Sequence, residues 1–185
     1  RELKPLQIGP MLKEALKLLR SSLPVTIEIS KFISPEVDNV MADPTQIHQV
    51  IMNLCTNAFH AMEEKGGELE VSLTEIELGA GEMPNGTDLS PGRYIQLMVA
   101  DTGHGIEREV LKRIFDPYYT TKEEGKGTGL GLAVVHGIIK EHGGDIQVSS
   151  ELGKGSVFHV YLPLIEIKDK EKEIVPEPVP RGNER

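Results

Sequence analysis

A long amphipathic helix with clear start and stop signals is the feature that most constrains the fold. Asp43-Pro44 supplies an N-cap followed by a residue preset for the first helical turn, and Gln46 stands where a capping box places it. Apolar residues then recur at helical spacing to about residue 62, and Gly66-Gly67 ends the pattern. The sequence therefore predicts one helix over 44–62 with a buried face.

The rest of the chain alternates between helix and strand patterns. Two further helices are expected at 10–20 and 132–142, and five strands at 25–29, 68–75, 94–100, 145–150 and 156–162. Residues 79–92 have loop composition, and the Gly-rich stretch 101–131 has no steady period. We predict an α+β fold, a two-layer sandwich in which one mixed sheet of about five strands packs against about three helices.

Composition argues against several classes of partner. The net charge of −9 and the absence of Trp are a poor match for nucleic-acid binding. A single cysteine, Cys55, allows no internal disulfide and fits a reducing compartment. No apolar run reaches the length of a membrane span. We expect no nucleic-acid partner, no direct membrane contact in this chain and a cytoplasmic location, whether the parent protein is soluble or membrane-anchored.

Polar side chains share one face of the predicted helix 44–62. Asn53, Asn57 and His60 are spaced so that they lie on the same side of a helix, bordering apolar positions. The plain interpretation is a hydrogen-bonded helix face. The functional interpretation is an edge that holds a ligand or a hydrated cation, because amide oxygens are neutral hard ligands that suit Mg²⁺. Spacing alone leaves both interpretations open.

Two glycine-containing segments add candidate sites. Asp101-Thr102-Gly103-His104-Gly105-Ile106 follows a predicted strand, and its glycines let backbone approach a ligand closely. Taken alone, an Asp-initiated turn explains it better. Residues 125–132 form a Gly-rich run at the start of a predicted helix. Such a run favours binding of an anion, but this one lacks the Gly-Lys-Ser/Thr ending of a P-loop.

In this combination and order, the segments resemble the catalytic and ATP-binding domain of bacterial sensor histidine kinases, within the GHKL ATPase superfamily. Residues 48–62 resemble its N box, 101–106 its G1 box, 115–122 its F box, 127–132 its G2 box, and 153–163 its closing hairpin. The resemblance covers roughly residues 10–165. It implies the GHKL fold, with ATP bound between the helices beneath a mobile lid near residues 116–128.

The resemblance also implies roles at the base of the nucleotide. Asp101 would accept a hydrogen bond from the adenine amino group, and Gly103 and Gly105 would let the backbone turn around the base. The further residues implied at the nucleotide are Thr102 and Ser156, through water, and Ile106 and Phe115.

At the phosphate end, the resemblance implies that Asn57 binds Mg²⁺ and that Asn53 supports the phosphates. Lys122, in the lid, would offer them a point charge. The residues implied to cradle phosphate are Gly127, Thr128, Gly129, Leu130 and Gly131. ATP and Mg²⁺ are therefore the expected ligands, and Asn53, Asn57 and Lys122 the expected catalytic residues.

One residue bears on whether ATP is hydrolysed or used for transfer. Relatives that hydrolyse ATP, such as gyrase and MutL, carry Glu one helical turn before the Mg²⁺ ligand, where this chain has Asn53. An amide cannot take a proton from water, so water is poorly activated. The resemblance thus implies a protein-histidine kinase that transfers the γ-phosphoryl group of ATP.

The histidine that accepts phosphate is expected on another domain. None of the six histidines of this chain precedes Glu or Asp, the setting expected for an acceptor. The expected partner is therefore a histidine-containing dimerisation domain of the same parent kinase, absent from this chain, through which the parent forms a homodimer. Two alternatives stay open: a serine kinase of the anti-sigma-factor type, and a nucleotide-binding interaction module without transfer activity.

The C-terminal segment is expected to lie outside the domain. Residues 1–165 are assigned to the catalytic domain, and residues 166–185, which are charged and contain alternating prolines, to a linker. The linker resembles those that lead into receiver domains of hybrid kinases. We expect the second partner to be a fused receiver domain or a separate response regulator.

Overall fold

The computed structural model describes residues 2–119 and 131–165. Its helices are α1 Ile8–Ser22, α2 Pro44–Met62, α3 Arg108–Leu111 and α4 Gly131–Glu141. Its strands are β1 Lys4–Leu6, β2 Ile27–Ile33, β3 Val40–Ala42, β4 Gly67–Leu78, β5 Gly92–Asp101, β6 Asp145–Glu151 and β7 Gly155–Pro163. Most of the expected lid and the whole expected linker 166–185 lie outside the described residues.

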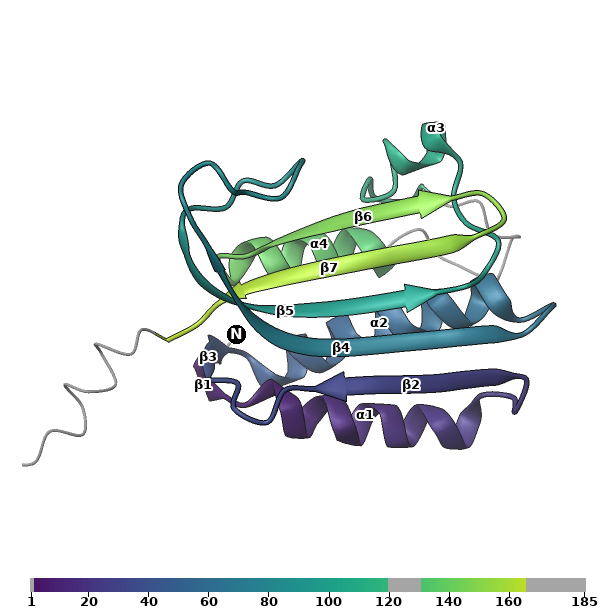
Figure 1. The fold of residues 1–185 in the computed structure, drawn as a ribbon, viewed down its shortest axis with the longest axis horizontal. Coiled ribbons are helices and arrows are strands. Elements are labelled where there is room, and N and C mark those ends of the chain that lie inside the picture. Colours follow the sequence, from purple (N-terminus) through teal and green to yellow (C-terminus); the bar gives the residue numbers. More distant parts are fainter. Residues whose placement is uncertain (1, 120–130, 166–185) are drawn as a thin grey trace, which may run out of the picture.

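Five of the described strands form one mixed sheet, and α1, α2 and α4 lie behind it in the view of Figure 1. The strand order is β2-β4-β5-β7-β6, in which only β2 and β4 pair in parallel. A parallel pair needs a crossover, and α2 supplies it because it lies between these two strands in the chain. The predicted two-layer α+β sandwich is confirmed.

The helix α2 runs through the centre of the core and has the predicted bounds. Its apolar residues pack with those of α1, α4 and the rear face of the sheet. Cys55 is fully buried in this cluster, and burial raises the pKa of its thiol to about 12, so it fills space as a small apolar residue. None of the described helices, α2 included, is both long and apolar enough to cross a bilayer.

The start of α2 differs from the predicted capping box. Asp43 Oδ1 accepts hydrogen bonds from the backbone N–H groups of Thr45 and Gln46 at 2.9 and 3.4 Å, which confirms the N-cap. The Asp43 N–H, however, donates to His142 Nε2 at 3.1 Å. Gln46 Oε1 is buried and has no hydrogen-bond partner among the described residues. The capping box is therefore wrong, because the packed end of α4 supplies the acceptor that Gln46 was expected to provide.

The strand β2 begins two residues later than the predicted range 25–29. Near the end of α1, the Arg20 guanidinium donates to three carbonyl oxygens, those of Leu23, Pro24 and Ile27, at 3.2, 2.7 and 2.6 Å. These bonds hold the connection as a turn. Val25 is consequently 91% exposed, and its apolar character is not a strand signal.

Three short elements are not predicted by the sequence. The strands β1 and β3 form a separate antiparallel pair in which Leu6 lies opposite Val40. The helix α3 lies within the stretch that was expected to be irregular. Segments of three or four residues are too short to display a period, so their structure depends on contacts that the sequence pattern does not contain.

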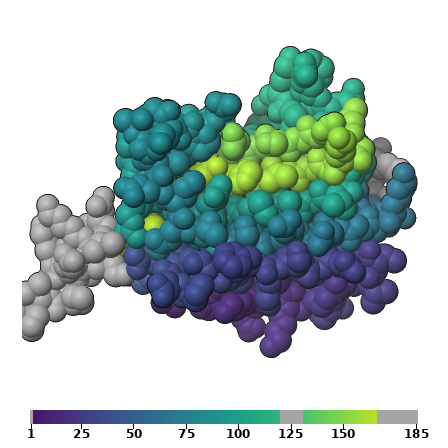
Figure 2. Space-filling view, in the orientation of Figure 1, coloured from purple at the N-terminus to yellow at the C-terminus, as the bar shows by residue number. Residues whose placement is uncertain are grey.

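The predicted loop 79–92 folds over one end of the outer face of the sheet. Leu78, Tyr94 and Tyr161 form a small second core there, and Met83 and Leu89 of the loop pack against it. In Figure 2 this loop rises above the sheet on one side and the α3 segment on the other, with β6 and β7 exposed between them. The loop lies on the face opposite the helices, so it does not contribute to the site described next.

Candidate functional site

The side chains that face the helices change from apolar to polar along one row at the end of the sheet. Two successive rows across β6, β7, β5 and β4 are entirely apolar: Ile146, Val160, Leu97, Leu73, and then Val148, Phe158, Val99, Val71. The next row reads Ser150, Ser156, Asp101, Leu69. Asp101 and Ser156 are only 8% and 4% exposed. Buried polar groups at the margin of a core mark this row as the candidate site.

Asp101 is the charged residue of this row. Burial raises the pKa of its carboxyl group, while hydrogen bonds from the backbone of Gly103 and Ser156 act in the opposite direction. Asp101 Oδ1 accepts the Gly103 N–H at 2.8 Å. The carboxylate is therefore oriented by the chain itself, and its acceptor oxygens are placed in a site with restricted access to water.

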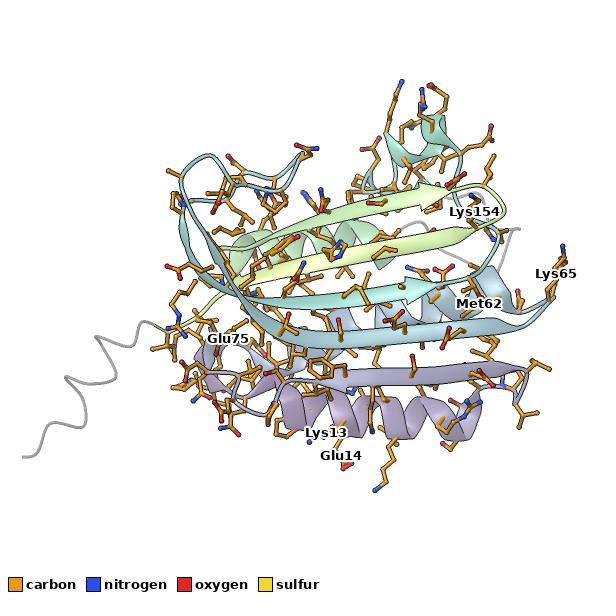
Figure 3. The ribbon with its side chains drawn as sticks, in the orientation of Figure 1. Lys13, Glu14, Met62, Lys65, Glu75 and Lys154 are labelled. Carbon is orange, nitrogen blue, oxygen red and sulfur yellow. The ribbon has the colours of Figure 1, made fainter. Side chains whose placement is uncertain are left out.

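The loop 101–106 that follows β5 is held from two sides. The His104 N–H donates to the Ala61 carbonyl at the end of α2, at 3.2 Å, and the His104 carbonyl accepts the Gly153 N–H of the β6–β7 turn, at 2.8 Å. Met62, which follows Ala61, and Lys154, which follows Gly153, are labelled in Figure 3 and lie at the same end of the molecule. Five of the expected site residues therefore lie on a loop whose backbone is anchored.

Both glycines of this loop are required by close backbone approach. A Cβ on Gly103 would collide with the backbone and side chain of Ala61, and one on Gly105 would collide with the Glu151 carbonyl. Gly105 also has a φ of +78°, which disfavours other residues. The space that each glycine leaves is filled by this chain, so their first role is to let the loop fit between α2 and the β6–β7 turn.

Thr102 is directed toward β4. Its Oγ1 accepts the Glu68 N–H at 2.9 Å and lies 3.7 Å from the sulfur of Met62. The hydroxyl thus ties the end of β5 to the start of β4. The expected water-mediated contact of Thr102 with a base stays a prediction.

The polar face of α2 lies at the same end of the core as this loop. Asn53, Asn57 and His60 are all half-buried. The Asn53 amide donates to the Gly131 carbonyl, the first residue of α4, at a long 3.5 Å. The His60 ring packs at 5.3 Å from that of Phe59. The structure therefore places Asn53 beside the start of α4, where the expected phosphate-binding run ends.

Two aromatic rings pack between the segment after α3 and the helix α4. Phe115 and His136 stack with ring centroids 5.0 Å apart. Phe115 is also packed against the main core. The ring therefore anchors the segment 107–119 onto α4, and its expected contact with a nucleotide stays a prediction.

Several expected site residues lie outside the described part of the chain. They are Lys122, Gly127, Thr128, Gly129 and Leu130. The structure thus positions the base end of the expected site and the start of α4, and the phosphate-binding roles of these five residues stay predictions.

One residue of the site was not singled out from the sequence. Ser150 accepts the Ile106 N–H at 2.7 Å and lies 2.8 Å from Ser156 Oγ. The signal was present, because Ser150 follows Ile146 and Val148 at alternate positions of a predicted strand. A serine in a core-facing position of a strand is a polar residue that needs partners.

The donor set limits the chemistry of the site. Among the described residues, no group of three or more His, Cys, Asp or Glu side chains is arranged to hold a metal ion. A cation here would depend on amide oxygens such as that of Asn57 and on oxygens of its own ligand, which suits Mg²⁺ bound to phosphates. The residues present therefore fit a nucleotide with Mg²⁺ better than a metal bound by protein alone.

Comparisons of the sequence and of the fold with known proteins both point to ATP-binding domains of histidine kinases. Residues 42–180 match the family model described as histidine kinase-, DNA gyrase B-, and HSP90-like ATPase. The sensor kinase CckA of Brucella abortus is 44% identical over 137 residues, 74% of this chain and 14% of that protein. The sensor histidine kinase ZraS of Escherichia coli K12 is 45% identical over 125 residues, 68% of this chain and 23% of that protein. The chain thus spans less than a quarter of the length of these relatives.

Solved structures of histidine kinases have the same fold as this chain. The catalytic domain of histidine kinase ThkA has a TM-score of 0.70 at 28% identity, covering 89% of this chain and 99% of that domain. Full-length ShkA in complex with AMPPNP has a TM-score of 0.65 at 28% identity, covering 88% of this chain and 31% of ShkA. ThkA in complex with the response regulator protein TrrA has a TM-score of 0.67 at 25% identity, covering 88% of this chain and 42% of ThkA.

Proposed function

This chain belongs to the histidine kinase-, DNA gyrase B- and HSP90-like ATPase family and forms the ATP-binding catalytic domain of a sensor histidine kinase; from this premise we propose that it transfers the γ-phosphoryl group of ATP to a histidine on a separate dimerisation domain. The observation that carries the proposal is the buried carboxylate of Asp101, held at the end of β5 by the Gly103 amide. Burial disfavours the charged form of this carboxylate, as its raised pKa shows. A carboxylate kept buried against that cost is typical of a functional site.

Asp101 is the residue that recognises the base. An ionised carboxylate only accepts hydrogen bonds, so it pairs with the exocyclic amine of adenine and not with a carbonyl oxygen. Gly103 and Gly105 fix the backbone of the same loop, which keeps this acceptor in one position. In a site of restricted water access, a misplaced acceptor costs affinity, so the anchoring of the loop contributes to selectivity.

Asn57 and Asn53 act at the phosphate end. Asn57 holds Mg²⁺ through its amide oxygen, and the ion, when bound, neutralises charge on the phosphate oxygens. Asn53, one helical turn earlier and beside Gly131, orients the same end of the ligand. Neither amide takes a proton from water, so the site does not activate water for hydrolysis.

The partners follow from the reaction. The phosphate acceptor is a histidine of the dimerisation domain of the parent kinase, and the phosphoryl group then passes to a response regulator or a fused receiver domain. The complex of the similar kinase ThkA with the response regulator TrrA supports this choice of second partner.

The test is transfer of label from γ-labelled ATP. The 185-residue chain is mixed with Mg²⁺ and a matched histidine-kinase dimerisation domain, or with the same domain carrying a His→Gln change at its acceptor. Acid-labile label on the unmodified domain alone supports the proposal. Acid-stable label on a serine favours the anti-sigma-factor type of kinase, and ATP binding without any transfer to either domain favours an interaction module.

A further inference from the structure

A half-buried serine beside the expected site for the base contacts three separate groups. Ser150 Oγ lies 2.7 Å from the Ile106 backbone nitrogen, 3.0 Å from the Gly155 carbonyl oxygen and 2.8 Å from Ser156 Oγ. These partners belong to the loop 101–106 and to β7. Ser150, on β6, therefore links the loop 101–106 to β7, the strand on which Ser156 pairs with Asp101.

The number of protons determines the direction of each bond. A hydroxyl has one proton and two lone pairs. The Ile106 amide donates to Ser150, whereas the Gly155 carbonyl only accepts, so the single Ser150 proton goes to Gly155. The contact between the two hydroxyls is then a hydrogen bond only if Ser156 donates to Ser150. In the arrangement that satisfies all three contacts, Ser156 presents only lone pairs to any other neighbour.

We propose that Ser150 is a positioning residue that keeps Ser156 Oγ as a hydrogen-bond acceptor next to the carboxylate of Asp101. Ser156 and Asp101 are register partners on β7 and β5, and their side chains share the face of the sheet that looks toward the helices. The polar row at this end of the sheet therefore presents acceptors from two adjacent strands. The proposal rests on the proposed function, because it assigns the selectivity of the same nucleotide site.

The chemistry of such an edge favours one class of base. The 6-amino group of adenine has two N–H donors, which two acceptors, directly or through one water, can satisfy together. The 6-carbonyl oxygen of hypoxanthine is an acceptor and would leave buried acceptors facing each other. Ser150 thereby contributes to selection of 6-aminopurine over 6-oxopurine nucleotides without touching the base.

The matched pair Ser150→Thr and Ser150→Val tests this role. The two side chains have nearly the same shape, and only Thr keeps the hydroxyl. Binding of ADP and of IDP to the 185-residue chain is measured by calorimetry for the wild type and both variants. We expect Ser150→Thr to retain the preference for ADP, and Ser150→Val to lower it about tenfold, since Ser156 then no longer has Ser150 as the acceptor for its proton.

A purely structural role would weaken ADP and IDP binding in parallel, with the preference unchanged. If Ser150→Val weakens binding of both nucleotides equally, and the wild-type chain binds ADP, the proposal is overturned and the proposed function stands. A wild-type chain that binds neither nucleotide overturns both.

Ser156→Ala gives an independent measurement if Ser150→Val does not fold. It should lower the preference for ADP by a similar factor, because it removes the acceptor itself. In the double variant Ser150→Ala with Ser156→Ala, the preference should fall no further than in Ser156→Ala alone. A further fall of the preference in the double variant, or an unchanged preference in Ser156→Ala, overturns the proposal.

Discussion

The carboxylate of Asp101 accepts a 2.8 Å hydrogen bond from the backbone N–H of Gly103, two residues later in the chain. This bond closes the turn that leads from β5 into the loop 101–106. It also orients a charged group whose pKa is raised by burial. The turn and the expected recognition of adenine therefore depend on the same side chain, and they can be separated by substitution.

Asp101→Asn should separate them. Asparagine keeps one oxygen for the Gly103 N–H but presents an N–H group where the second acceptor oxygen was. We expect affinity for ADP to fall about tenfold or more, because a hydrogen bond to a charged group contributes about 1.5–3 kcal/mol. Calorimetry measures the effect, and Glu109→Gln, an exposed change on α3, is the control. Equal affinity of the wild type and Asp101→Asn would remove Asp101 from the base site.

Asn57→Ala should abolish the effect of Mg²⁺ on nucleotide binding. We expect wild-type affinity for ADP to rise when Mg²⁺ is added, and the variant to show the Mg²⁺-free affinity under both conditions, since the amide oxygen is the proposed ligand. Asn57→Asp retains an oxygen ligand and should retain the response. If Asn57→Ala responds to Mg²⁺ like the wild type, the residue has only a structural role on α2.

Asn53→Glu should increase ATP hydrolysis by the isolated chain. The wild type is expected to turn over ATP slowly and not to label itself. A correctly placed general base accelerates such a step by about 10²–10⁴-fold, and loss of the 3.5 Å contact with Gly131 will reduce that gain here. Asn53→Gln has the same length without the basic oxygen and is the matched control. Equal rates of phosphate release from the two variants would contradict the assignment.

His142→Ala should destabilise the fold away from the site. His142 Nε2 accepts the Asp43 N–H at 3.1 Å, and Nδ1 lies 2.7 Å from the Ile138 carbonyl. We expect the free energy of unfolding in urea to fall by about 1–3 kcal/mol, because a backbone donor loses its partner. Gln46→Met, which removes an oxygen that is buried without a partner among the described residues, should cost much less. A larger loss for Gln46→Met would contradict this account of the α2 start.

His159 should make stability depend on pH. It lies on β7 beside Tyr161, with ring centroids 6.4 Å apart, and burial lowers the pKa of its imidazole below the ordinary value for histidine. Between the two pKa values the unfolded chain binds more protons than the folded chain, so the free energy of unfolding decreases as pH falls from about 7 through this window. His159→Gln should flatten the slope in urea titrations at successive pH values. Identical slopes for the wild type and His159→Gln would contradict the prediction.

Local signals in the sequence were sufficient for the main elements. The bounds of α2 follow from Asp43-Pro44 and the glycine pair after it, and the predicted hairpin around residues 152–155 is the turn between β6 and β7. In each case the residues responsible are neighbours in the chain, so the pattern and the structure depend on the same short-range physics.

By itself, the sequence determined the type of each long element, the order of the boxes and the candidate acceptor Asp101. Only the tertiary structure decided which strands pair and how the helices pack, and the contacts between distant residues depend on both. Ser150 meets Ile106 across 44 residues, and the Asp43 amide meets His142 across 99. The physical reason is that strand register and helix packing are set by burial of the whole core, and no local pattern states which buried polar group will face which partner.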